Sequence, residues 1–136
     1  MKRFCFECKD EQDVKVVRKK EVFPVMGDPI EVVSDVMTCF VCGEEIFDET
    51  LDEKNIARVY QEYRNKHNFL SPMEIKSIRS KYGSTRRVAK LLGWSPTTIA
   101  RYENGSIPDL AHHEQLLRLK NDPCYIRELL QQRGDD

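Results

Sequence analysis

Four of the five cysteines form two pairs with the same spacing, and this pattern points to metal chemistry. The pairs are Cys5-Phe6-Glu7-Cys8 and Cys39-Phe40-Val41-Cys42. Each pair can bend through a tight turn that directs two thiolates at one ion, and two such turns give a tetrahedral sulfur site. Soft thiolates favour Zn²⁺, which needs no redox partner. We therefore expect one zinc ion per chain, held by Cys5, Cys8, Cys39 and Cys42.

A site with four cysteine ligands leaves no coordination position for water, so we expect the ion to be structural rather than catalytic. A disulfide framework is disfavoured because the sequence shows no secretory signal and leaves an odd cysteine, Cys124. We expect Cys124 to be a half-buried apolar residue. A redox site would use one pair and leave the other unexplained, whereas iron–sulfur binding stays open for four cysteines.

The residues between the cysteine pairs predict the sheet that must hold them. Four segments rich in β-branched or aromatic side chains favour strands: residues 14–17, 21–23, 30–33 and 36–37. Met26-Gly27-Asp28-Pro29 is the best turn candidate, with Gly for a positive φ and Pro to end ladder pairing. A module of this size rarely has a sufficient hydrophobic core. We expect a small antiparallel sheet fastened by zinc, whose register the sequence does not predict.

A helix is expected after the sheet. Thr50-Leu51-Asp52-Glu53 has the form of a capping box, in which Thr50 bonds the N3 amide and Glu53 reaches back to the cap. One apolar stripe follows at helical spacing: Ile56, Val59, Tyr60 and Tyr63. This stripe either packs on a neighbouring module or docks a partner protein. The charged residues face elsewhere: Arg58, Glu62, Arg64 and Lys66.

The sequence from residue 71 onwards predicts five short helices with clear ends. Ser71, Ser84 and Ser95 can cap helices over residues 72–82, 85–92 and 96–103, and Gly83 and Gly93 can end the first two. Asp109 can cap a fourth helix, and Asp122-Pro123 opens a fifth. Helices 85–92 and 96–103, joined by a short turn, indicate a helix-turn-helix, whose second helix enters the DNA major groove. Trp94 is expected to pack at the turn.

Polar residues of the predicted recognition helix are suited to reading bases. Thr97, Thr98 and Arg101 fall on its exposed side, whereas Ile99, Ala100 and Tyr102 should pack on or border the core. Arg101 can bond guanine O6 and N7, and the threonines can contact base edges or a thymine methyl. Phosphate contacts are expected from Lys76, Arg79, Arg86, Arg87, Lys90 and Ser95. The alternative is a plain helical bundle with a basic surface, and His112 and His113 are expected to be solvated or capping residues.

The segment LGWSPTTIARYENG, residues 92–105, resembles the Cro/repressor (XRE-type) helix-turn-helix, whose recognition helix commonly closes with Arg-Tyr-Glu, one residue and Gly. With the cysteine pairs and the intervening helix, nearly the whole chain resembles the MqsA-type antitoxin family, also called the YgiT-type zinc finger plus helix-turn-helix family. The resemblance implies the zinc ligands named above, base reading by Thr97 and Arg101, and a structural Glu103. Thr97 stands where the family often has Asn, so the operator sequence does not carry over.

The same resemblance implies a repressor that binds a palindromic operator as a homodimer through its five-helix C-terminal domain and binds a ribonuclease toxin through its zinc module. The acidic stretch over residues 44–53 would suit a basic nuclease. The helix-turn-helix also resembles regulators of mobile elements that have other partners. A stand-alone regulator with a non-toxin partner is therefore the alternative.

Composition and charge set the remaining bounds. The 136 residues carry 22 Lys and Arg against 23 Asp and Glu, a net charge of -1 that conceals an acidic segment (residues 43–56) and a basic one (residues 71–107). No apolar run approaches the roughly 18 residues of a membrane span, and no phosphate loop, HExxH motif or nucleophile–base pair suggests an enzyme. We expect a cytoplasmic α+β protein with three parts: a zinc module (1–49), a connecting helix (50–70) and a DNA-binding domain (71–136).

Overall fold

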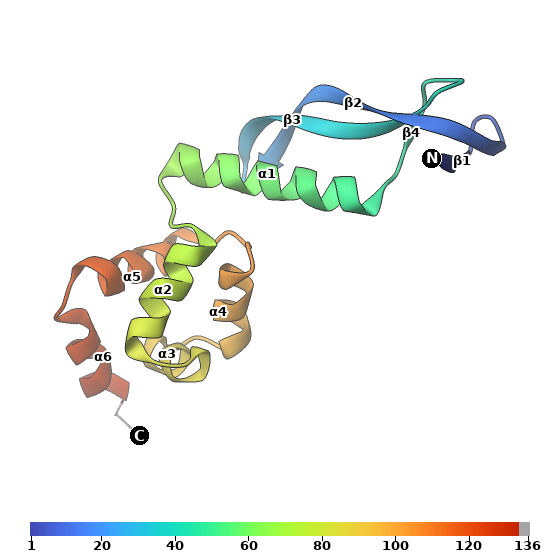
Figure 1. Cartoon of the computed structure of the whole chain (residues 1–136). Coiled ribbons are helices and arrows are strands. Elements are labelled where there is room, and N and C mark those ends of the chain that lie inside the picture. Colours follow the sequence, from blue (N-terminus) through green and yellow to red (C-terminus); the bar gives the residue numbers. More distant parts are fainter. Residues whose placement is uncertain (134–136) are drawn as a thin grey trace. The chain divides into compact units, whose positions relative to one another are not determined.

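The computed structural model describes residues 1–133 and divides into two compact units. The first unit is Met1–Tyr63, and the second begins at Arg64. A four-stranded antiparallel sheet comes first in the chain and six helices follow (Figure 1). The expected α+β class is confirmed. Within the described residues, no helix is both long enough and apolar enough to cross a membrane.

The sheet of the first unit is dominated by one long hairpin (Figure 1). Its strands in sheet order are β1 (Lys2–Cys5), β2 (Asp10–Val25), β3 (Asp28–Cys39) and β4 (Glu45–Ile46). Met26 and Gly27 both have positive φ, 50° and 81°, as the tightest hairpin turns require. The four apolar segments of the sequence are therefore parts of two continuous strands.

The expectation that Pro29 ends the ladder is wrong. Pro29 lies inside β3, directly opposite Pro24 of β2, and the pairing continues on both sides of them. Antiparallel residues alternate between pairs that exchange backbone hydrogen bonds and pairs that do not. Because Val25 and Asp28 close the two-residue turn, the next pair is of the second kind, so two residues without an N–H fit there.

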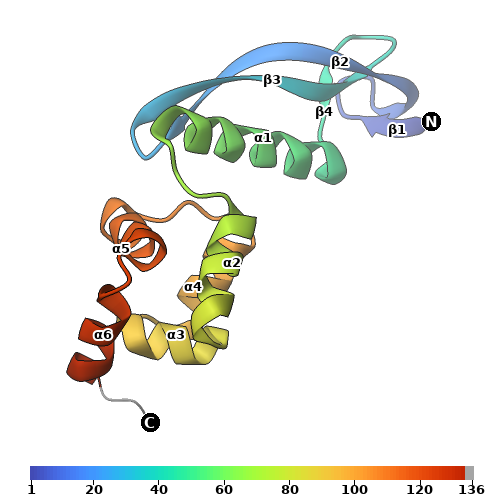
Figure 2. The same cartoon turned by 60° about the vertical axis from the view of Figure 1, so that its left-hand side comes forward.

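Helix α1 (Glu49–His67) runs along the hairpin over the residues that belong to the first unit (Figure 2). Val59 and Tyr63 are buried, as the apolar stripe predicted, whereas Ile56 remains 45% exposed. The Thr50 capping box is wrong. Asp48 caps the helix instead, because its carboxylate accepts the N–H of Leu51 at 3.0 Å and its carbonyl accepts the N–H of Asp52.

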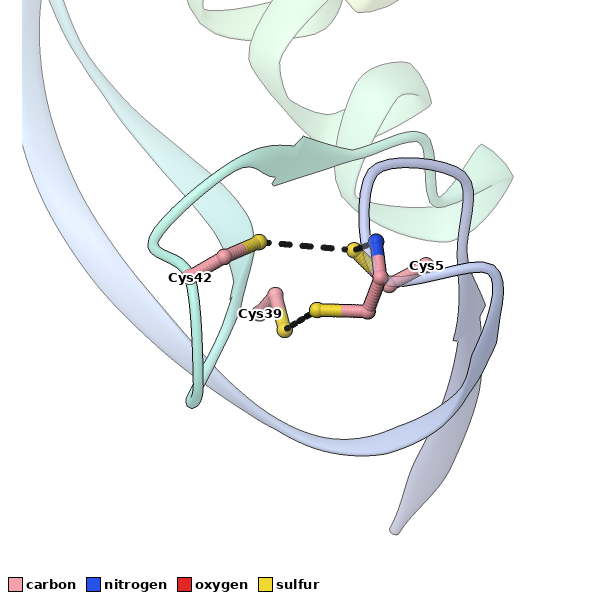
Figure 3. Close-up of side chains that lie close together, drawn as sticks. Cys5, Cys39 and Cys42 are labelled. Carbon is pink, nitrogen blue, oxygen red and sulfur yellow. Dashed lines mark hydrogen bonds between the residues drawn. The ribbon is translucent and has the colours of Figure 1, made fainter.

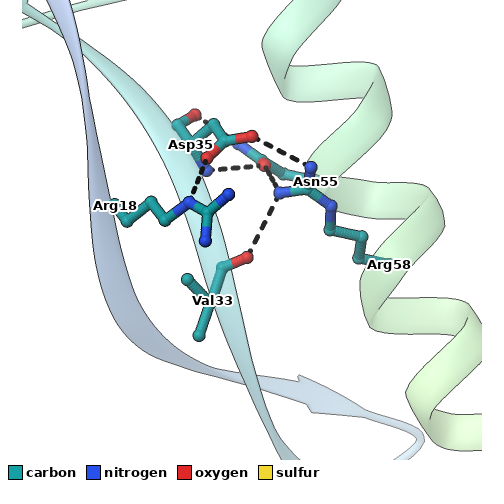
Figure 4. A network of polar contacts seen from close by, with 5 residues as sticks. All are labelled: Arg18, Val33, Asp35, Asn55 and Arg58. Atoms are coloured by element: carbon teal, nitrogen blue, oxygen red, sulfur yellow. Dashed lines mark hydrogen bonds and ion pairs between the residues drawn. The ribbon is translucent and has the colours of Figure 1, made fainter.

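Polar contacts fasten α1 to β3 (Figure 4). The side-chain amide of Asn55 donates to the carbonyl of Asp35 at 2.9 Å, and its oxygen accepts the N–H of the same residue at 3.0 Å. The carboxylate of Asp35 accepts from Arg58 at 2.9 Å and lies 3.9 Å from Arg18. Asn55 thus takes the place of a neighbouring strand at a position that β4 is too short to reach.

The second unit is a bundle of five helices around one apolar core. The helices are α2 (Pro72–Tyr82), α3 (Thr85–Leu92), α4 (Pro96–Glu103), α5 (Leu110–Asn121) and α6 (Tyr125–Arg133). The predicted bounds of the first three and their serine caps are confirmed, and Asp109 caps α5. Ile75, Val88, Ala89, Ile99 and Leu116 are each at most 2% exposed and belong to the core that all five helices share.

Two polar residues of the second unit are buried: Arg64, which was expected to face away from the apolar stripe, and His113, which was expected to be solvated or capping. Arg64 is 6% exposed and donates to the carbonyl of Gly105. His113 is 5% exposed, and its ring stacks on Phe69 with centroids 3.8 Å apart. These partners are distant in sequence, so helical periodicity alone does not reveal the contacts.

His112 and Cys124 also differ from expectation. His112 is half-buried, and its Nδ1 lies 2.7 Å from the hydroxyl of Tyr102, so it belongs to the packed interior rather than to solvent. Cys124 is exposed because it lies in the turn before α6, where its N–H donates to the side chain of Asp122.

Candidate metal centre and nucleic-acid interface

The four paired cysteines converge in the first unit (Figure 3). Their Sγ atoms all lie within 4.8 Å of one another. The sulfurs of Cys5 and Cys42 are 3.5 Å apart, and those of Cys8 and Cys39 are 3.9 Å apart. Sulfur ligands at about 2.3 Å around a tetrahedral ion lie about 3.8 Å from one another. The cluster therefore has the dimensions of a four-sulfur site and could hold a metal ion.

The two CxxC turns share one local geometry. In the first, the N–H of Lys9 donates to the carbonyl of Cys5 at 2.7 Å, and in the second the N–H of Gly43 donates to the carbonyl of Cys39 at 2.9 Å. Lys9 and Gly43 both have positive φ, 58° and 80°. The residue after each pair thus closes a tight turn in the left-handed region, which favours glycine. The cysteine spacing alone does not reveal this position, although Gly43 is a sequence signal for it.

The strands set the distance between the two turns. Residues 2–5 of β1 pair with residues 10–13 of β2, and Val14 of β2 pairs with Cys39 of β3. Cys5 and Cys39 are 1% and 0% exposed, whereas Cys42 is exposed. The sheet therefore brings a cysteine pair from near the start of the chain against one that follows it by more than thirty residues.

The thiols influence one another's protonation. The backbone N–H of Cys42 contributes most to lowering the pKa of Cys39, to about 7. A hydrogen bond with the Cys42 thiol and burial raise the pKa of Cys8 to about 12. The Cys39 thiol therefore ionises more readily than an ordinary cysteine and the Cys8 thiol less readily, and binding of a cation would release the remaining protons. This donor set suits a soft divalent metal ion and has no place for a substrate.

Helices α3 and α4 form a helix-turn-helix in the second unit. Residues 93–95 connect them, and Gly93 adopts the left-handed conformation with φ of 79°. Trp94 packs at this turn as expected, partly buried against the core, and its Nε1 donates to Gln115 at 3.3 Å. The turn is therefore held by the core side chains of the bundle.

Helix α4 divides into a buried face and an exposed face. Ile99 and Tyr102 are 2% and 9% exposed, whereas Thr97 and Arg101 are exposed. Ala100 is exposed too and does not border the core as expected. An exposed Thr and an exposed Arg one turn apart are groups that can reach base edges from a helix in the major groove.

Ser95 and Thr98 build the start of α4. The hydroxyl of Ser95 accepts the N–H of Thr98 at 3.2 Å, and the two hydroxyls lie 2.9 Å apart. Thr98 is only half-exposed. These contacts hold the first turn of the helix, so both hydroxyls have partners inside the protein.

Arg79 differs from the other predicted phosphate-contacting residues. It is mostly buried and donates to both carboxylate oxygens of Glu103 at 2.8 and 3.0 Å and to the carbonyl of Gly83. This pair joins α2 to α4, because Arg79 lies on the first helix and Glu103 ends the second. Arg79 is thus engaged in positioning α4. Lys76, Arg86, Arg87 and Lys90 are exposed.

Residues 75–119 match the helix-turn-helix family model. The match covers about a third of the chain, and this part is similar to helix-turn-helix domains. The match runs from α2 into α5, includes both α3 and α4, and supports a DNA-binding regulator. The helix-turn-helix family is one of DNA-binding regulators rather than enzymes. No curated protein and no solved structure matches the chain.

Proposed function

We propose that this protein is a sequence-specific transcriptional repressor that reads an operator with α4. The observation that carries the proposal is the division of α4 into a buried face with Ile99 and an exposed face with Thr97 and Arg101. Arg101 bonds a guanine in the major groove, and Thr97 contacts the neighbouring base. Thr98, whose hydroxyl already meets that of Ser95, contributes less to base reading.

Exposed cations around α4 hold the helix on the DNA backbone. Ser95 and the exposed basic residues of α2 and α3 contact phosphates in this proposal, and Arg79 is left out because Glu103 neutralises it. We further propose that the protein acts as a homodimer through residues 71–136. A two-fold dimer would place its recognition helices roughly 34 Å apart on a palindromic operator.

We propose that the cysteine cluster holds one structural Zn²⁺ ion per chain. Tetrahedral four-sulfur coordination is typical of zinc sites that stabilise small modules. Because β2 lies between β1 and β3 in the sheet, an ion bound by all four thiols would join β1 and β3 directly. Residues 1–49 would then form the zinc module, and residues 50–70 the connection to the DNA-binding part.

We propose that the zinc module binds a ribonuclease toxin and that the protein is the antitoxin of a type II pair. This proposal is supported by the order of the two modules and by the acidic segment, where Glu44, Glu49 and Glu53 are exposed carboxylates. Such a surface favours association with a basic protein. The alternative is a regulator of a mobile element whose acidic module binds a partner that is not a toxin.

Substitution of Arg101 tests base reading. Arg101→Ala should cost about 1–3 kcal/mol of discrimination between operator and unrelated DNA, because it removes one bidentate base contact. Gel-shift titrations on the promoter upstream of the gene measure this ratio. Arg127→Ala is the matched control, since Arg127 is exposed on α6. An unchanged ratio for Arg101→Ala would exclude α4 as the reading helix.

The partner proposal is tested with the protein encoded beside this gene. Expression of that neighbour alone should arrest growth and degrade RNA, and co-expression of the full-length chain should prevent both. The two proteins should also co-purify as a complex. A neighbour that has no effect on growth or RNA would favour the regulator with a non-toxin partner.

A further inference from the structure

A cleft of about 550 Å³ lies within the first unit, between α1 and the sheet. Residues of β2, β3, β4 and α1 line it, so its wall is assembled from segments far apart in sequence. Its volume lies within the range of sites for small organic molecules, which is roughly 300–1,000 Å³. The cleft is separate from the cysteine cluster, because none of the four paired cysteines lines it.

The apolar part of the wall includes three aromatic side chains that come from different parts of the first unit. Phe23 of β2, Phe47 after β4 and Tyr60 of α1 line the cleft, together with aliphatic residues such as Val36 and Ile56. Phe47 is 76% exposed and Ile56 is 45% exposed, so apolar surface remains accessible there. Aromatic rings attract organic cations through the negative potential of their faces.

The charged part of the wall is entirely acidic. Five carboxylates line the cleft, and no Lys, Arg or His does: Glu21, Asp35, Glu45, Asp48 and Asp52. Three of them have ion-pair partners that lie outside the lining: Arg58 for Asp35, Lys19 for Glu45 and Arg3 for Asp48. Glu21 and Asp52 have no ion pair among the described residues. Lys19 also interacts electrostatically with Glu21, so the negative charge of the cleft is least compensated at Asp52.

A buried polar group in the wall has no partner. Ser34 of β3 lines the cleft and is 1% exposed, and its hydroxyl makes no hydrogen bond within residues 1–133. A buried hydroxyl without a partner destabilises the fold, and the large majority of buried polar side-chain atoms in proteins do have a hydrogen-bond partner. A ligand with a polar hydrogen would satisfy this hydroxyl.

We propose that this cleft binds a small organic cation, with an amine or ammonium group on an aromatic or aliphatic body. The apolar wall buries the body, the ring faces and the carboxylates of Glu21 and Asp52 attract the charge, and the Ser34 hydroxyl accepts or donates one hydrogen bond. This site is independent of the DNA-reading face. Because ligand contacts bridge α1 and the sheet, occupancy stabilises the folded first unit.

Titration of the ¹⁵N-labelled full-length chain with tryptamine tests the proposal, and indole-3-acetate serves as a probe of similar body and opposite charge. Tryptamine should cause saturable shifts of amide signals at the cleft, with Ser34, Val36 and Asn55 among them. Indole-3-acetate should bind at least tenfold more weakly. Equal shifts with both probes, shifts outside the cleft, or none with tryptamine would overturn the proposal.

Two pairs of variants distinguish binding of tryptamine in the cleft from non-specific electrostatic attraction to the acidic surface. Asp52→Asn should raise the tryptamine Kd about fivefold, as expected when one solvent-exposed ion pair is lost, whereas Glu53→Gln on the next residue should leave the Kd unchanged. Ile56→Lys should abolish binding by placing a cation in the wall, whereas Ala57→Lys outside the lining should not. All four α1 positions are exposed, so folding should be preserved, and the amide spectrum checks this. Equal effects within either pair would contradict the assignment.

Discussion

Each of the two units of this protein is stabilised by a different kind of internal contact. The second unit has a continuous core to which all five of its helices contribute, and Ile75, Val88 and Leu116 are almost fully buried in it. In the first unit, the most buried residues include Cys5, Cys39 and Ser34, while Phe6, Phe40 and Phe47 are more than half exposed. The first unit therefore adds its cysteine cluster and polar contacts to a few buried apolar residues such as Ile30 and Met37, whereas the second depends on apolar packing.

This difference follows from how each segment can bury apolar surface. An amphipathic helix buries its stripe against other helices, and five helices around one centre make a closed core. A long two-stranded hairpin covered by a single helix leaves much of its surface in water. The first unit accordingly has the hydrogen bonds between Asn55 and Asp35 and a cluster of four thiols that could hold a metal ion. Substitution of a metal ligand, of a core residue or of a polar contact should therefore change the stability of only the unit that contains it.

Loss of a thiol should have the largest effect. Cys39→Ser should remove the metal ion and unfold the first unit, because structural zinc contributes about 10–16 kcal/mol to the folding of small modules. Elemental analysis and the dispersion of amide signals from residues 1–63 measure both consequences. Cys124→Ser provides the control, since Cys124 is exposed and lies outside the cluster. Full metal content in Cys39→Ser would refute the assigned ligand set.

A cavity in the core of the second unit should have the next largest effect. Leu116→Ala should lower the free energy of unfolding of that unit by about 2–5 kcal/mol, because Leu116 is 2% exposed. Leu110→Ala on the same helix should change it little, because Leu110 is 64% exposed. Thermal melting gives the stability of each variant, and metal content should stay constant in both. A loss of metal from Leu116→Ala would mean that the units are not independent.

Removal of the Asn55 side chain should destabilise only the first unit. Asn55→Ala leaves the N–H and the carbonyl of Asp35 without their partner, which should cost about 1–3 kcal/mol. Glu53→Ala, an exposed change on the same helix, is the reference. Urea titration followed by amide signals of β3 detects the difference. Equal midpoints for the two variants would show that this polar contact does not fasten α1.

Acid should weaken the second unit slightly through His113. Burial lowers the pKa of His113 below its ordinary value of 6.5, so the unfolded chain binds the proton more readily than the folded chain. The stabilisation is complete above about pH 6.5 and is lost as the pH falls through that value towards the folded-state pKa. His113→Phe should remove this dependence, and His67→Phe should keep it. Thermal melts between pH 5 and about pH 7.5 decide between these outcomes.

Local signals explain why the helices of the second unit were predictable. Ser71, Ser84 and Ser95 accept N–H groups at the starts of their helices, and Gly93 takes a left-handed conformation at the end of α3. Such caps act within one turn, so the sequence near each end contains the necessary information. The paired cysteines were predictable for a similar reason, because each CxxC turn is a local structure.

Contacts between distant segments were not predictable. Thr50 has the right pattern for a cap, but Asp48 is favoured there, where Arg3 from the first strand also holds its carboxylate. The burial of Arg64 depends on Gly105, and that of His113 on Phe69. The cleft around Ser34 likewise exists only when four elements come together. No sequence window contains both sides of these contacts.

Chelation of the full-length protein, followed at once by amide spectra and by DNA titration, tests directly whether a metal-fastened module and an independent DNA-reading bundle share this chain. Removal of the ion should collapse the signals of residues 1–63 and leave those of the second unit dispersed. Because the proposed dimer contacts lie within residues 71–136, the affinity for the DNA site should stay unchanged. Simultaneous loss of the helical signals and of DNA binding, or an unchanged first unit after the metal is gone, would contradict that division.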